Sequence, residues 1–250
     1  MVSKLDLIGT EFETKSGKCF IIDYKNNKEI VVLFYEGLFL LKTRLGDLKS
    51  GSVRNPYHKN SKICGVGVCD IRTKTNKVSD KEYVLWNNII KRCYSDNIHR
   101  IRPTYKECTM SDDWLIYSSF KNDVLGMVGS DKVGWHLDKD LLIKGNKVYS
   151  KDTCCFLPPR LNTFLLSGKK FRSLYPCGVS FSKYKNKFSA RIKIDNVDKV
   201  LGYFNTPEEA FKAYKEAKES YARELAHRWK DQIDERAFQA LMNYEVDIND

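Results

Sequence analysis

Alternating apolar and polar residues in the last third of the chain predict a small sheet followed by a helix. Three short strands are expected at 178–180, 187–192 and 201–204. The sequence Thr206-Pro207-Glu208-Glu209 then supplies an N-cap, a proline at the first helical position and a glutamate at the third. The helix that follows should bury one stripe of side chains: Ala210, Tyr214, Ala217, Tyr221 and Leu225. A last helix is expected at about 234–244.

The N-terminal pattern predicts a small β unit between residue 10 and about residue 50. β-Branched and aromatic residues are dense at 18–24, 29–34 and 38–41, and turn signals at Asn26-Asn27 and Gly37 separate these runs. The unit has the size of an SH3-like barrel or curled sheet. The stretch 49–79 that follows is rich in loop-forming residues.

Helical spacing begins after this stretch. Ser79-Asp80-Lys81-Glu82 has the pattern of a capping box, and apolar residues from Tyr83 to Tyr94 recur at helical intervals. A second helix is expected to start at Ser111-Asp112-Asp113, because acidic groups suit a helix N-terminus. Its aromatic residues (Trp114, Tyr117 and Phe120) have the spacing of core positions rather than of a base-stacking platform.

The segment 134–165 reads as strand, turn, strand and helix. The first strand is expected within 134–143, the turn at 144–147, the second strand at 148–150 and the helix from Pro158 onward. In this arrangement the side chains of His136, Asp138 and Asp140 alternate onto one face of the first strand.

Composition and charge favour a polyanionic partner. The chain has 250 residues and a formal net charge of +11, which points to nucleic acid before an anionic membrane. It contains no apolar run near the ~20 residues that a membrane-spanning helix needs, and its first residues lack a signal-peptide core. We therefore expect a soluble, cytoplasmic protein with no membrane partner.

The eight cysteines include no Cys-x-x-Cys pair. We expect them to be reduced and to act as small apolar residues. A structural zinc on Cys64 and Cys69 is the alternative, although no second ligand pair follows at zinc-finger spacing.

The C-terminal strands and helix carry a family pattern. Its elements are Gly178-Val179, Phe188-Ser189-Ala190-Arg191-Ile192, Leu201-Gly202-Tyr203-Phe204 and Glu209-Ala210 with Tyr214. In this order they resemble the AP2 DNA-binding domain over residues of roughly 175–230, with helix alanines spaced slightly differently. The resemblance implies that the sheet lies in the major groove of double-stranded DNA and that Arg191 and Lys193 contact bases or phosphates.

Basic residues cluster in the same segment. The candidate DNA-binding residues are Lys183, Lys185, Lys187, Arg191, Lys193 and Lys199, and they face only Asp195 and Asp198 among acidic neighbours. An ordinary solvated face of a small sheet is the alternative interpretation.

Residues 80–167 resemble phage-encoded endonucleases of the HNH type, whose ββα-metal core is often followed by an AP2-like domain. The resemblance implies a divalent metal, Mg²⁺ or Mn²⁺, held by Asp138 and by Asn162 on the helix, and an Asn146 that orients the general base. At the position of the family's general-base histidine this chain has Lys139, which is a poor base because lysine is protonated near neutrality.

Three interpretations of this hairpin follow. His136 could replace the missing base or act as a metal ligand, since it shares a strand face with Asp138. Asp138 and Asp140 could form with it an oxygen-rich metal cluster. Alternatively, the site is inactive and the hairpin only packs or binds DNA.

Together these patterns predict an α+β protein of three small modules. They are a small SH3-like β unit (1–57), a linker (58–79), an HNH-like ββα core (80–167), and an AP2-like domain with C-terminal helices (168–250). We expect a double-stranded DNA-binding endonuclease that hydrolyses phosphodiester bonds with a divalent metal, in the bacterial host cytoplasm if phage-encoded. The alternatives are a non-catalytic phage protein that binds DNA or a host protein and has a degenerate nuclease core, and, third, an RNA binder.

Overall fold

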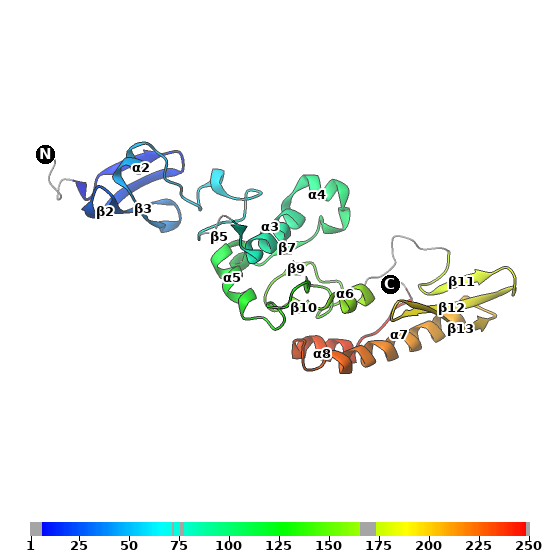
Figure 1. The fold of residues 1–250 in the computed structure, drawn as a ribbon. Coiled ribbons are helices and arrows are strands. Elements are labelled where there is room, and N and C mark those ends of the chain that lie inside the picture. Colours follow the sequence, from blue (N-terminus) through cyan, green and yellow to red (C-terminus); the bar gives the residue numbers. More distant parts are fainter. Residues whose placement is uncertain (1–6, 72, 76–77, 166–173, 249–250) are drawn as a thin grey trace. The chain divides into compact units, whose positions relative to one another are not determined.

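The computed structural model describes residues 7–71, 73–75, 78–165 and 174–248 (Figure 1). Helices and strands are both well represented, so the predicted α+β class is confirmed. Residue contacts divide the chain into two compact units, one of 1–124 with 147–150 and the other of 125–146 with 151–250. The residues of the predicted core at 80–167 are distributed over both units, and the predicted module boundaries stay predictions.

The first unit opens with a four-stranded antiparallel sheet in the order β1-β2-β3-β4. Its strands are β1 (Glu11–Thr14), β2 (Gly17–Asn26), β3 (Glu29–Phe34) and β4 (Leu40–Thr43), with the short turns η1 (Glu36–Leu38) and α2 (Leu45–Lys49) beside them. Alternate residues of β3, namely Ile30, Val32 and Phe34, are buried against Cys19 and Ile21 of β2. The three predicted strands of this segment are therefore present.

The rest of the first unit is mostly helical. Its elements are η2 (Lys59–Ser61), β5 (Lys74–Thr75), β6 (Val78–Ser79), α3 (Lys81–Tyr94), α4 (Asp96–Ile101), η3 (Pro103–Tyr105), β7 (Thr109–Met110), η4 (Asp112–Leu115), α5 (Tyr117–Leu125) and β9 (Val148–Tyr149). The predicted core aromatics are buried, and Trp86 Nε1 donates a hydrogen bond of 2.7 Å to the carbonyl oxygen of Trp114. This bond satisfies an indole N–H that would otherwise be costly to bury.

Two predicted helix starts are wrong in detail. The N-cap of α3 is Asp80 rather than Ser79, and no side chain caps the helix. Instead, the Asp80 carboxylate accepts a hydrogen bond of 2.9 Å from Lys121 Nζ. The residues after Ser111 form the 3₁₀ turn η4, and the α-helix α5 begins only at Tyr117.

The second unit contains a hairpin whose pairing differs from the prediction. β8 (His136–Asp138) pairs antiparallel with β10 (Cys155–Leu157), and α6 (Pro159–Leu165) follows directly. The predicted second strand at 148–150 is not its partner, because β9 pairs in parallel with β7 of the first unit. The chain turns directly after β8, and the strand that pairs with β8 is β10, which follows the predicted strand at 148–150 in the sequence.

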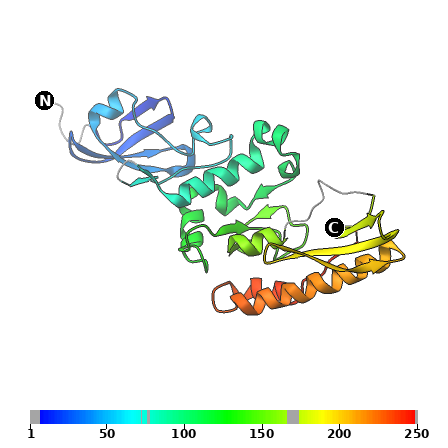
Figure 2. The same ribbon diagram turned by 45° about the vertical axis from the view of Figure 1, so that its right-hand side comes forward.

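The C-terminal part of the second unit is a three-stranded antiparallel sheet covered by a long helix. Its elements are β11 (Val179–Ser182), β12 (Lys187–Ile194), β13 (Val197–Phe204), α7 (Pro207–Trp229) and α8 (Glu235–Met242). The predicted capping box is formed: Thr206 accepts a hydrogen bond from the Glu209 amide, and the Glu209 side chain accepts one from the Thr206 amide. Figure 2 shows α7 running along one face of this sheet.

Two apolar clusters hold the second unit together. One joins the sheet to α7 through Ala190, Ile192, Phe211 and Tyr214, and the other joins β10 and α6 to α7 and α8. Among the helices that the structure describes, none has both the length and the apolar character required to cross a lipid bilayer.

Gly178 provides a test of how the sheet packs on α7. Its φ of +76° lies in the left-handed region, and an added Cβ would overlap the ring of Tyr214. Gly145 has a similar φ of +77° but open space around it. We expect Gly145→Ala to lower the free energy of unfolding by about 1–2 kcal/mol, for backbone strain alone. Gly178→Ala should lower the free energy of unfolding by about 1–3 kcal/mol more than Gly145→Ala does, because the added methyl group also overpacks the core.

Urea denaturation of the two glycine variants, followed by circular dichroism, measures this difference. Equal losses of stability in both variants would show that the Gly178–Tyr214 approach is not tight.

Candidate nucleic-acid interface and nuclease-like hairpin

The strand register separates two faces of the C-terminal sheet. Ala190 and Ile192 of the central strand β12 are buried toward α7, with exposed fractions of 0% and 5%. Successive residues of a strand point to opposite faces, so Arg191 and Lys193 point away from α7, and both are exposed. We call the face opposite α7 the outer face; its exposed or polar members are Ser180, Lys187, Ser189, Arg191, Lys193, Asp198, Val200 and Tyr203.

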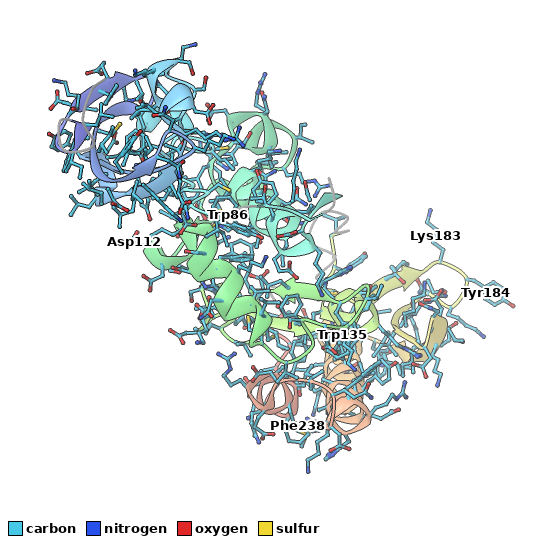
Figure 3. All side chains as sticks on the ribbon, turned by 60° about the vertical axis from the view of Figure 1, so that its left-hand side comes forward. Trp86, Asp112, Trp135, Lys183, Tyr184 and Phe238 are labelled. Carbon is cyan, nitrogen blue, oxygen red and sulfur yellow. The ribbon has the colours of Figure 1, made fainter. Side chains whose placement is uncertain are left out.

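Basic and aromatic groups gather at one end of the outer face. Lys183 and Lys185 lie in the turn between β11 and β12, where Figure 3 shows Lys183 and Tyr184 projecting away from the sheet. Lys185 Nζ lies 5.4 Å from the ring centre of Tyr184 and 6.0 Å from that of Tyr203. The outer face therefore offers cations beside exposed phenol groups, both of which can bind phosphate oxygens.

Lys199 does not share this face. A bulge between Ala190 and Arg191 shifts the register, so that Ala190 pairs with Gly202 but Arg191 pairs with Val200. Lys199 is consequently opposite Ile192, on the side of the sheet that α7 covers. Of the six predicted DNA-binding residues, Lys199 is thus separated from Arg191 and Lys193.

The two neighbouring acidic residues differ in their effect on this face. Asp198 lies opposite Lys193 and reduces the local positive charge. Asp195, in the β12–β13 turn, accepts hydrogen bonds from Tyr221, Arg228 and Arg160. The Tyr221 hydroxyl, followed by the two arginines, lowers the pKa of the Asp195 carboxyl. Its negative charge is therefore already compensated within the second unit.

The hairpin brings together two of the candidate site residues, His136 and Asn162. The ring nitrogen Nδ1 of His136 on β8 lies 3.0 Å from the amide nitrogen of Asn162 on α6. His136 is exposed and Asn162 half-buried. Strand and helix thus bring a candidate catalytic residue and a candidate metal ligand within hydrogen-bond distance of each other.

The acidic residues of the hairpin have other partners. Asp138 Oδ1 accepts the backbone N–H groups of Asp140 and Leu141, at 2.9 and 2.8 Å, and so closes the turn that ends β8. Burial raises the pKa of the Asp138 carboxyl even though these two N–H groups favour its charged form. The predicted shared face of Asp138 and Asp140 is wrong, because the strand ends at Asp138.

Lys139, at the position of the family's histidine, is built into the loop. Only 7% of Lys139 is exposed, and its ammonium donates to Asp140 Oδ1 at 2.5 Å and to the Asn146 carbonyl at 2.9 Å. The Asn146 side-chain amide in turn donates to the Lys139 carbonyl at 2.8 Å. Asn146 therefore supports the backbone at Lys139.

This donor set does not fit a divalent metal ion. One oxygen of Asp138 serves the turn, and Asp140 is paired with an ammonium group. Across 7–71, 73–75, 78–165 and 174–248, no three His, Cys, Asp or Glu side chains lie close enough together to hold a metal. These residues therefore support no metal-dependent reaction step.

All eight cysteines are free thiols, and five of them are buried, in keeping with their predicted apolar role.

Comparison of the chain with models of known protein families, with curated proteins and with solved structures finds no match. The resemblances to AP2 domains and HNH nucleases therefore rest on the residues quoted for them.

Sequence reasoning missed three functional candidates that lie on or beside the C-terminal sheet. Tyr203 belongs to a recognised motif, but only the register places it on the outer face. Arg160 and Lys218 lie far from the sheet in sequence and come beside β12 only through the packing of α6 and α7. Nothing in the local pattern of the last two residues signals this position.

The raised pKa of Asp138 predicts a pH-dependent stability. A carboxyl whose pKa is higher in the folded state stabilises the fold when protonated, and this contribution is lost as the pH rises through the folded-state pKa. Asp138→Asn keeps the acceptor oxygen but removes the buried charge. We expect the variant to be more stable than the parent at neutral pH, with a difference that shrinks as the pH falls toward the ordinary aspartate value of 3.8.

Urea unfolding across this pH range checks the expectation. A variant that is less stable than the parent at neutral pH would show that the Asp138 charge is well paired.

Proposed function

We propose that this protein binds double-stranded DNA through the outer face of its C-terminal sheet and does not hydrolyse it. The observation that carries the proposal is the position of Arg191 and Lys193. They point outward on the central strand, which Ala190 and Ile192 anchor to α7. Among the described residues, neither side chain forms an ion pair, so both cations are available to phosphates or base edges.

The size and chemistry of the outer face agree with this role. The major groove of B-DNA is about 12 Å wide and admits a narrow β-ribbon. The exposed hydroxyl groups of Ser180 and Tyr203 lie between the cations, and such groups commonly donate to phosphate oxygens. RNA binding remains the alternative: the exposed rings of Tyr184 and Tyr203 could stack on bases, whereas most aromatic side chains of the described helices are in the core.

The hairpin supports a non-catalytic role. The buried Lys139 ammonium is held by Asp140 and the Asn146 carbonyl, so it is poorly placed to take a proton from water. The pairing of His136 with Asn162 is the one observation that favours an endonuclease. This pair alone lacks the acidic ligands that a nuclease metal requires.

A plasmid experiment separates the two functions. We expect the purified protein to retard a double-stranded DNA fragment and to leave supercoiled plasmid intact with Mg²⁺ or Mn²⁺. Metal-dependent nicking that is abolished by Asp138→Ala, with DNA binding retained, would establish the endonuclease instead. Absence of both binding and cleavage would contradict the proposal and direct attention to a host protein as the partner.

Lys193 and Lys199 form a matched pair for testing the face. Both are exposed lysines on adjacent strands, but only Lys193 lies on the outer face. If Lys193 neutralises one phosphate, Lys193→Gln should reduce the slope of log K against log salt by about 0.9. Lys199→Gln should leave the slope unchanged.

Fluorescence anisotropy of a labelled duplex, measured at several salt concentrations, gives both slopes. A larger effect of Lys199→Gln would place the DNA on the opposite side of the sheet.

A further inference from the structure

A cavity of about 610 Å³ lies beside the C-terminal sheet, between α6, α7 and the second half of β12. Small-molecule sites typically have volumes of about 300–1,000 Å³, so the cavity is large enough for a compact ligand. It adjoins the outer face at Arg191 and Lys193, but its other walls come from α6 and α7.

The cavity opens onto an unpaired edge of β12. Pairing between β11 and β12 ends at Val179 and Ala190, and the Arg191 amide makes a last hydrogen bond of 2.8 Å to the Gly178 carbonyl. Alternate residues of a strand direct their backbone groups to the same edge, so the N–H of Lys193 also points toward this side. Within the described parts of the chain, no strand covers this edge beyond Arg191.

Positive charge predominates around the cavity. Arg160 of α6, Arg191 and Lys193 of β12 and Lys218 of α7 line it, against the single carboxylate of Asp195. That carboxylate is already bonded to Tyr221, Arg228 and Arg160, so the excess positive charge comes from Arg191, Lys193 and Lys218. The cavity therefore favours an anionic ligand.

The ammonium group of Lys218 supplies one of these positive charges from a buried position in the cavity wall. Only 8% of the residue is exposed, and its ammonium lies 5.4 Å from the ring centre of Phe164 and 5.7 Å from that of Tyr214. Aromatic faces at such distances stabilise a cation that has lost much of its water. The same rings, with Tyr221, form an aromatic wall beside the charge.

The shape of the edge argues against an added peptide strand. Only Ile192–Ile194 remain between the last β11 bond and the turn at Asp195-Asn196, whose φ angles are +53° and +64°. Strands in globular proteins most often have about 5–6 residues, so this edge is too short for stable strand addition. A compact anion with a flat aromatic part matches the cavity better.

We propose that the cavity binds a nucleotide, with its phosphate near Lys218 and Arg160 and its base against the aromatic wall. Stacking of a base on an aromatic side chain contributes about 1–3 kcal/mol, and charge-assisted hydrogen bonds hold phosphate. The ligand is either a free nucleotide or one nucleotide of a single strand, which share this chemistry. The inference stands on the cavity and does not require that the outer face bind duplex DNA.

Calorimetric titration of the full chain with dAMP, deoxyadenosine, inorganic phosphate and a short single-stranded deoxyadenosine oligonucleotide tests the proposal. We expect dAMP to bind at least about tenfold more tightly than deoxyadenosine or phosphate, because each of these lacks one half of the interaction. Binding of the oligonucleotide but not of dAMP would identify the ligand as part of a strand.

Three variants complete the test. Lys218→Met keeps the aliphatic stem and should weaken binding at least about tenfold by removing the charge. Lys212→Met, an exposed lysine on the same helix outside the cavity, is the matched control and should bind as the parent does. Thr163→Trp, at an exposed position of the cavity wall, should weaken binding by filling the space.

Failure of both dAMP and the oligonucleotide to bind would overturn the proposal, as would equal binding by the parent, Lys218→Met and Thr163→Trp. Duplex affinity of Lys218→Met, measured in parallel, should equal that of the parent, so a failure here is distinct from a failure of the outer face to bind duplex DNA.

Discussion

Burial of Ala190 and Ile192 beneath α7 determines which residues of the C-terminal sheet can reach a ligand. Because side chains alternate along β12, this one packing contact also directs Arg191 and Lys193 outward. Tyr214 of α7 packs so closely on Gly178 that the start of β11 is fixed as well. The arrangement of the basic groups on the outer face is therefore a consequence of the apolar core.

Local sequence patterns predict this part of the fold well. The three strands, the Thr206–Glu209 capping box and the buried stripe of α7 all depend on residues close together in the chain. The position of Lys199 could not be predicted in the same way. If side chains alternated regularly along β13, Lys199 and Tyr203 would lie on the same face of the sheet. The extra residue Leu201 at the bulge interrupts this alternation, so Lys199 lies on the opposite face from Tyr203.

The hairpin shows a different limit of sequence reasoning. Its strands have only two or three residues, so alternation carries little information, and the partner of β8 is decided by contacts distant in sequence. The side chain of Asp138 ends β8 by accepting two backbone N–H groups. Because of this turn and the burial of Lys139, residues that resemble a metal site in sequence instead form a hydrogen-bonded loop. The Lys139 ammonium stabilises this loop through its hydrogen bonds, and this role could not be predicted from the position of Lys139 in the sequence.

The second unit thus has two positively charged surfaces of different shape on the same strand. The outer face suits an extended polyanion, whereas the cavity beside Lys218 is concave, has aromatic rings in one wall and suits a single nucleotide. Asp195 lies at the end of β12 between them and links α6, α7 and the β12–β13 turn through Arg160, Arg228 and Tyr221. This network holds the cavity wall against the strand that carries the outward-pointing cations Arg191 and Lys193.

The most direct test of the central claim is an NMR titration of the isotopically labelled full chain with duplex DNA. Chemical-shift changes should concentrate on outer-face residues, including Arg191, Lys193 and Tyr203, and on the β11–β12 turn, while buried residues of α7 change little. Changes confined to α7 or to the N-terminal sheet, with the outer face unaffected, would contradict the account.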